Sequence, residues 1–212
     1  MPRQLITLQK DSVMAQAIQP KQVTTVSAFF LISVWIVAIA SIPSASSFRE
    51  QLDAGKANKD IVTLSDSVSI ITLIASIGAW LVTSRWLAQR YDQQVSISPG
   101  SIRLSRPWAF WSWIVPVVSL WFPKMIIDDL LKAKENDSGQ IITKHKTKSV
   151  LSETRTWWFC FVLYSLMSNL KTVWVLLPTA GEVPIHPEFE LASACILTAS
   201  YTIWVRIVNR IG

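Results

Sequence analysis

Two adjacent carboxylates, Asp128 and Asp129, are the side chains of this sequence best suited to chemistry, because they stand beside a long apolar segment. In that position a carboxylate can bind a cation or receive a proton. Asp128 can also pair with Lys132 four residues later. The apolar residues around the pair recur at helical spacing, at Ile126, Ile127, Leu130 and Leu131. We predict a helix lying on a membrane surface, with the aspartates on its solvated face as the favoured interpretation and a cation or proton site as the alternative.

A second cluster is basic and precedes the next apolar segment. It comprises Lys144, Lys146 and Lys148. Near an anionic bilayer surface, each such lysine contributes about 1 kcal/mol of attraction to lipid headgroups. The run is short and lacks interleaved aromatic residues, so nucleic-acid binding is not expected. We predict that these three lysines contact lipid headgroups.

Other catalytic or metal-binding patterns are weak or missing in the sequence. His186, Glu188 and Glu190 are of metal-ligand type, but they have no defined ligand spacing and no ordered scaffold. There is no glycine-rich phosphate loop, zincin helix motif or serine nucleophile elbow. We therefore predict no metal site, no cofactor and no catalytic residue.

Small and polar residues form two stripes at helical spacing within apolar segments. Such faces let membrane helices approach closely and form hydrogen bonds, and they can also line a polar path. Packing is the favoured interpretation, and a translocation path is the alternative. The stripes are Ser69, Thr72, Ser76, Ala79 and Thr83 in one segment and Ser165, Asn169 and Thr172 in another.

The elements that carry these residues belong in a bilayer. Of the 212 residues, 50% are hydrophobic and only 16% are charged, the net charge is +6 and the mean hydropathy is +0.35. An average soluble domain has about 25% charged residues. Cys160 and Cys195 are too few for a disulfide framework and are predicted to be packing thiols. We predict a cytoplasmic segment over residues 1–22 and a single all-α membrane domain over 23–212.

Five hydrophobic segments approach the roughly 20 residues that a membrane-spanning helix needs. Pro20 and Pro43 flank the first segment, where prolines punctuate helices. The third segment differs because Pro116 and Pro123 lie inside it, and each is expected to kink or break a helix. The segments are 23–42, 65–83, 108–127, 157–177 and 191–205.

The distribution of lysine and arginine indicates how many segments cross. If all five cross, the basic residues of the connections divide as twelve against seven, and a cytoplasmic N-terminus puts the larger number outside. If segment 108–127 instead enters and returns to the same side, sixteen lie inside and three outside. The positive-inside rule therefore favours four transmembrane helices, both termini in the cytoplasm, and a proline-broken re-entrant or interfacial segment. Five transmembrane helices are the alternative.

The broken segment also resembles the signature of a bacterial membrane family called domain of unknown function 4328. That signature has Trp-x-x-Pro, then Leu-Trp-x-Pro, then an acidic residue before an apolar one. The resemblance covers about residues 60–212 and implies a membrane location without an activity. Ser119 and Leu131 depart from the residues that the family often has there. The matching positions are Trp108, Trp113, Pro116, Leu120, Trp121, Pro123, Asp128 and Asp129.

These observations predict a multi-pass protein of the bacterial inner membrane. The leading hypothesis is a non-enzymatic structural or partner-binding component, whose tryptophan-rich broken segment docks against its own helices or those of a membrane protein partner. The second hypothesis is a small channel or transporter component that uses this segment, since broken backbone at membrane depth often lines a cavity. A lipid-modifying enzyme ranks third, because Asp128 and Asp129 are its only plausible catalytic groups.

Overall fold

The computed structural model describes residues 17–57, 60–114, 118–137, 144–176 and 186–212, without the side chains of 135–137, 144–150 and 170–176. Over these residues the secondary structure is helical and contains no strand, which confirms the all-α prediction. The described cysteines, Cys160 and Cys195, are free. The elements are α2 (Pro20–Asp53), α3 (Leu64–Ile97), α4 (Trp108–Trp111), the short 3₁₀ helix η2 (Val118–Leu120), α5 (Phe122–Asp137), α6 (Lys144–Leu176) and α7 (Pro187–Ile211).

Three helices within the described residues, α2, α3 and α7, are long and apolar enough to cross a membrane. The outer faces of α2 and α3 are strongly apolar. On α2, exposed large apolar side chains recur every three or four residues at Phe29, Ile32, Ile36, Ile39 and Ile42. Such a face is costly in water and favourable in hydrocarbon, so these helices suit a bilayer.

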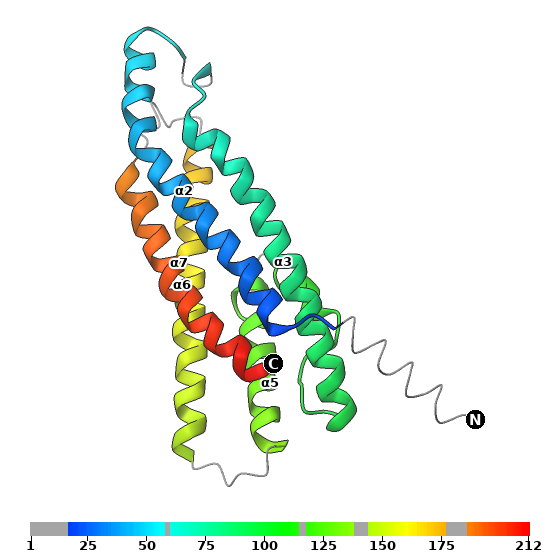
Figure 1. Ribbon diagram of the computed structural model, residues 1–212. Helices are drawn as coiled ribbons and strands as arrows, with labels where there is room; N and C mark the ends of the chain where they lie inside the picture. The colour runs from blue at the N-terminus through cyan, green and yellow to red at the C-terminus, as the bar shows by residue number, and fades with distance from the viewer. Residues whose placement is uncertain (1–16, 58–59, 115–117, 138–143, 177–185) are drawn as a thin grey trace, which may run out of the picture.

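The long helices form two hairpins that pack on each other. α2 packs along α3, α6 packs along α7, and α2 packs along α7. In Figure 1 the start of α2, the end of α3, the start of α6 and the C-terminus all lie at one end of the bundle. α4 and α5 lie toward this end too, which we call the α5 end.

Pro43 does not end the first helix, contrary to the sequence prediction. α2 continues through it for ten more residues to Asp53. The proline removes only one backbone donor, and a helix packed against its neighbours tolerates that loss. Next to it, the Ser44 hydroxyl donates to the Ala40 carbonyl at 2.6 Å and accepts the Ser65 N–H at 3.1 Å. This serine joins the end of α2 to the start of α3.

Segment 108–127 is not one continuous helix within its described residues, as its prolines predicted. It divides into α4, a turn over 112–114, η2 and the start of α5. Pro123 occupies the first turn of α5, where a helix needs no N–H donor, so this proline begins a helix. Pro116 lies outside the described residues.

The largest core cluster lies where α5 meets the long helices. Trp86 of α3, Trp157 of α6 and Trp204 of α7 are all buried in it. The rings of Trp157 and Trp204 stack with centroids 5.0 Å apart, and the ring of Trp86 meets Trp204 edge to face at 6.3 Å. Aromatic contacts of this kind add to the area that the rings bury. They fix α3, α6 and α7 to one another at the α5 end.

Candidate functional site

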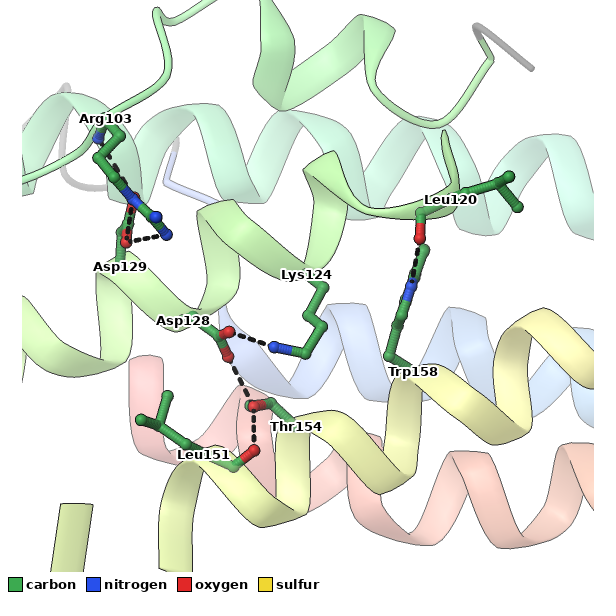
Figure 2. A network of polar contacts seen from close by, with 8 residues as sticks. All are labelled: Arg103, Leu120, Lys124, Asp128, Asp129, Leu151, Thr154 and Trp158. Atoms are coloured by element: carbon green, nitrogen blue, oxygen red, sulfur yellow. Dashed lines mark hydrogen bonds and ion pairs between the residues drawn. The ribbon is translucent and has the colours of Figure 1, made fainter. Parts of the chain in front are cut away.

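Asp129 attaches the loop before α4 to α5. Its carboxylate accepts hydrogen bonds from the Arg103 guanidinium, at 3.1 Å from Nε to each oxygen and 2.9 Å from Nη2 to Oδ1. The Arg103 backbone N–H adds a bond of 3.2 Å to Oδ2 (Figure 2). The Asp129 side chain is 5% exposed and that of Arg103 57% exposed. The pair therefore buries the acid while the base remains at the surface.

This pairing sets the electrostatics of Arg103. Its pKa is raised, first by the side-chain hydrogen bond to Asp129 and then by the charge of that carboxylate. Because an arginine is already protonated at neutral pH, the ion pair persists over the physiological range. Arg103 thus acts as a permanent positive anchor for the loop.

Asp128 attaches α5 to α6. Its carboxylate accepts a hydrogen bond from the Thr154 hydroxyl at 2.6 Å and pairs with the Lys124 ammonium (Figure 2). Thr154 is fully buried, and its hydroxyl also lies 3.1 Å from the Leu151 carbonyl. The carboxylate therefore has a cation on its own helix and a neutral donor on the next one.

These contacts correct the prediction made for the two aspartates. Neither lies on a solvated face: Asp128 and Asp129 are both buried. Asp128 pairs with Lys124 one turn before it, whereas the predicted partner, Lys132, is exposed. The reason is that α6 and the loop before α4 pack on α5 and supply partners, Thr154 and Arg103, that a lone surface helix lacks.

A third contact joins α5 to α7. The Lys134 ammonium donates to the Ile211 carbonyl at 3.2 Å, near the end of α7. Burial lowers the pKa of Lys134, and the charge of Arg90 lowers it further. α5 is therefore attached to the preceding loop, to α6 and to α7.

The broken segment docks on the protein's own helices. The ring of Trp108 meets Phe122 edge to face with centroids 4.9 Å apart, which folds α4 back on α5. The indole of Trp158 in α6 donates from Nε1 to the Leu120 carbonyl at 2.7 Å (Figure 2). This bond satisfies the carbonyl of the last residue of η2.

The turn after α4 inserts between α3 and α6. Trp113 contacts Trp158 and Phe161 of α6, with centroids 6.3 and 6.1 Å apart. On the other side, the ring of Phe110 lies 4.7 Å from that of Trp80 in α3. The segment thus bridges two helices that do not pack extensively on each other over their described residues.

The remaining predicted positions have mixed outcomes. The side chains of Leu120 and Trp121 are 51% and 44% exposed, whereas Pro123 is fully buried. The side chains of Lys144, Lys146 and Lys148 lie outside the described ones, so their predicted contact with lipid headgroups stays a prediction. Their backbone forms the first turns of α6.

A cavity of about 420 Å³ lies between α2, α3, α6 and α7, and Trp113 lines it too. The two polar stripes predicted from the sequence both line it, so these faces border one space and do not pack tightly on each other. Thr72, Ser76, Ala79 and Thr83 come from α3, and Ser165 and Asn169 come from α6. Thr172 has no described side chain.

Most polar groups of the cavity are already hydrogen-bonded. The Ser76 hydroxyl donates to the Leu73 carbonyl at 2.7 Å, and the Ser165 hydroxyl to the Phe161 carbonyl at 2.9 Å. Among the lining side chains, three buried atoms have no hydrogen-bond partner in the described part of the chain. They are Thr72 Oγ1, Trp80 Nε1 and Trp113 Nε1.

Comparison with known proteins adds the family. A family model described as Domain of unknown function (DUF4328) matches residues 49–211. The chain belongs to the DUF4328 family. The match confirms the resemblance drawn from the tryptophan and proline motif. No curated protein and no solved structure matches the chain. The DUF4328 match includes α3 to α7. It includes only the last residues of α2, although α2 supplies one wall of the cavity.

The sequence did not identify several partners in this site. Arg103 and Thr154 each lie 26 positions from the aspartate that they bind, and neither belongs to a periodic pattern. Trp80 stands in the middle of an apolar segment, where a core role is the ordinary expectation. The sequence signal that Trp80 lines the cavity was its position directly after Ala79 of the polar stripe.

Proposed function

We propose that this DUF4328 protein crosses a bacterial inner membrane four times, through α2, α3, α6 and α7. Both termini then face the cytoplasm, and segment 108–127 enters the bilayer and returns to the same side. This proposal is supported by α3 ending and α6 beginning at one end of the bundle (Figure 1). It is also supported by the sixteen basic residues that this arrangement gathers on the cytoplasmic side.

The depth of the broken segment fits this arrangement. Phe110 contacts Trp80, which lies five residues before Arg85 on α3. At 1.5 Å of rise per residue, the segment reaches about 7.5 Å beyond the level of Arg85. An arginine at the end of an apolar helix segment belongs near the interface. The segment is therefore a shallow insertion.

We infer that the protein is a non-enzymatic binding component that holds an apolar part of another membrane molecule in its cavity. The cavity itself is the observation that carries this inference. Its volume of about 420 Å³ falls within the range of about 300–1,000 Å³ of ligand-binding pockets. Its lining is aromatic, aliphatic and hydroxylated, with no charged side chain among the described residues.

A channel or transporter component is the second candidate. It is favoured by the two polar stripes that border one cavity. The hydroxyls of Ser76 and Ser165, however, donate to carbonyls of their own helices, so they offer few free donors to a polar solute. A lipid-modifying enzyme ranks third because Asp128 and Asp129 are engaged elsewhere and neither lines the cavity.

Filling the cavity tests the binding function. We expect native mass spectrometry to detect lipids or other apolar molecules bound to the wild-type protein. In Ala79→Phe the added ring projects from a lining position, so we expect these bound molecules to be lost. Ile77→Phe is the matched control, since Ile77 is on the same helix, is 47% exposed and does not line the cavity. Equal retention of bound molecules by wild type, Ala79→Phe and Ile77→Phe would contradict the proposal.

A further inference from the structure

Two cations at the α5 end have no acidic partner among the described residues. Arg90 of α3 holds its guanidinium over the ring of Trp86, with Cζ 5.9 Å from the ring centroid. Its Nη1 donates to Gln93 Oε1 at 2.9 Å. Lys134 of α5 donates to the Ile211 carbonyl at 3.2 Å. These three partners are neutral, so each cation is held in place without being neutralised.

The acids described at this end are already paired with other cations. The pairs are Asp92 with Arg106, Asp128 with Lys124, Asp129 with Arg103 and Glu153 with Arg210. No described carboxylate therefore offsets the charge of Arg90 and Lys134.

The two cations lie close together. Trp86 and Leu130 belong to the same buried core cluster, and α3 packs on α5. Arg90 follows Trp86 by one turn of α3, and the same spacing on α5 separates Lys134 from Leu130. The charge of Arg90 acts on Lys134 and lowers its pKa, while burial lowers the pKa of Arg90. An anion held between the two would favour both charged forms.

The hydrogen-bond donors that remain on this pair suit a phosphate group. A guanidinium has five N–H donors and an ammonium has three, and only one on each has an acceptor among the described residues. The guanidinium fork matches the oxygens of a phosphate, and an ammonium binds phosphate as a point charge. Lys134 is exposed and Arg90 is half-buried, so a ligand can reach both from outside the core.

In the proposed topology, Arg90 lies at the depth of lipid headgroups. It follows Arg85 by five residues, which is about 7.5 Å of helix toward the α5 end. An arginine such as Arg85, at the end of an apolar segment, belongs near the interface. The headgroup layer is about 5–7 Å thick on each side of the hydrocarbon core. The guanidinium of Arg90 is therefore level with headgroup phosphates.

We propose that Arg90 and Lys134 together bind one phosphate group. The ring of Trp86 and the Ile211 carbonyl hold the two cations in position. An anionic phospholipid headgroup and free inorganic phosphate share this chemistry, and the depth of Arg90 favours the headgroup. The site is independent of the binding function proposed above, because neither cation lines the cavity.

Native mass spectrometry of the full chain in a neutral detergent tests the site. The chain is titrated with phosphatidylglycerol and with diacylglycerol, which has the same acyl chains and no phosphate. We expect Arg90→Gln and Lys134→Gln each to weaken phosphatidylglycerol binding by about fivefold, the effect of one basic residue near an anionic surface. Binding of diacylglycerol should not change.

Matched control variants separate a site from a general positive field. Arg85→Gln and Lys132→Gln each remove one positive charge from an exposed position of the same two helices. We expect them to retain the wild-type affinity for phosphatidylglycerol. Equal losses in the site variants and the controls would overturn the proposal.

Hydrogen exchange on the wild-type protein needs no variant, so misfolding of one variant leaves the test intact. Phosphatidylglycerol should slow amide exchange about twofold at the ends of α3 and α5, over residues 88–97 and 131–137, and diacylglycerol should not. Equal binding and equal protection by the two lipids would show that the phosphate is not recognised.

Millimolar sodium phosphate distinguishes the two sources of the ligand. Failure to displace phosphatidylglycerol supports the lipid headgroup. Displacement, with the same protection of α3 and α5 by inorganic phosphate alone, keeps the site and makes free phosphate its ligand. Ala79→Phe fills the cavity and should leave the dependence on Arg90 and Lys134 unchanged, so failure of the cavity function and failure of this site are distinguishable.

Discussion

Asp128 and Asp129 are neighbours in sequence and have separate structural roles. Because successive residues of a helix point about 100° apart, one carboxylate faces α6 and the other faces the loop before α4. A pair of adjacent acids suggests a shared site when it is read from sequence alone. Here each acid has its own cation, so the pair acts as two anchors for α5.

We expect Asp128→Asn to destabilise the folded protein by about 2 kcal/mol, because it leaves the Lys124 ammonium without its carboxylate in a mostly buried place. Thermal unfolding in detergent, followed by near-ultraviolet circular dichroism, measures the change. Asp92→Asn is the control. Asp92 pairs with Arg106 at 2.8 Å, but both side chains are largely exposed, so no measurable change is expected. Equal effects of the two substitutions would refute the anchoring role of Asp128.

The side-chain partners of Asp128 and Asp129 were the least predictable part of the site. The helical spacing around Asp128 correctly predicted a helix, but Lys124 and Lys132 are both four residues from Asp128. Spacing cannot distinguish these two lysines. The choice depends on Thr154 and on the loop that carries Arg103, and both are distant in sequence.

At the scale of elements, the prolines show how far local rules extend. Pro123 begins α5 and Pro43 is accommodated inside α2, although both were treated as breaks in the sequence. The rule that a proline lacks a donor holds at both places. Its consequence differs because a helix start needs no donor and a packed helix tolerates one lost bond. The division of segment 108–127 into short pieces was predictable, but not its docking between α3 and α6.

The bond from Trp158 to the Leu120 carbonyl is predicted to hold η2 in place. Trp158→Phe retains an aromatic ring and removes the donor, so amide hydrogen exchange over residues 118–125 should become about fivefold faster. Exchange followed by mass spectrometry resolves this segment. Trp121→Phe, a substitution at an exposed indole on the same segment, should leave the rate unchanged. Unchanged exchange in Trp158→Phe would show that ring packing alone holds η2.

At the scale of the whole molecule, the four long helices of the described residues are consistent with the proposed topology. Two hairpins place the start of α2, the end of α7 and the α5 region at one end (Figure 1). The charge count favours the same grouping of connections, because basic residues gather in the connections at this end. The cavity could not be predicted in this way, since it depends on which faces of α3 and α6 are left apart.

Side-specific labelling tests the proposed topology. Single cysteines at Ala57, Lys132 and Glu188, all exposed, are introduced after Cys160 and Cys195 are replaced. In intact cells an impermeant thiol reagent should label the first and third positions but not the second. Labelling at Ala57 and Lys132 without Glu188 would instead mean five crossings. Permeabilised cells, in which all three positions should react, provide the control.

The hairpin pairing also gives the chain an order of assembly. Synthesis proceeds at about 5–20 residues per second, so α2 and α3 are complete on the order of ten seconds before α7 has emerged. In the proposed topology, the first hairpin stands in the membrane during that interval, with its small-residue stripe facing lipid. The cavity comes into being only when α7 docks against α2 and brings α6 with it. Bilayer lipid is therefore the first occupant available to it, present before the walls are closed.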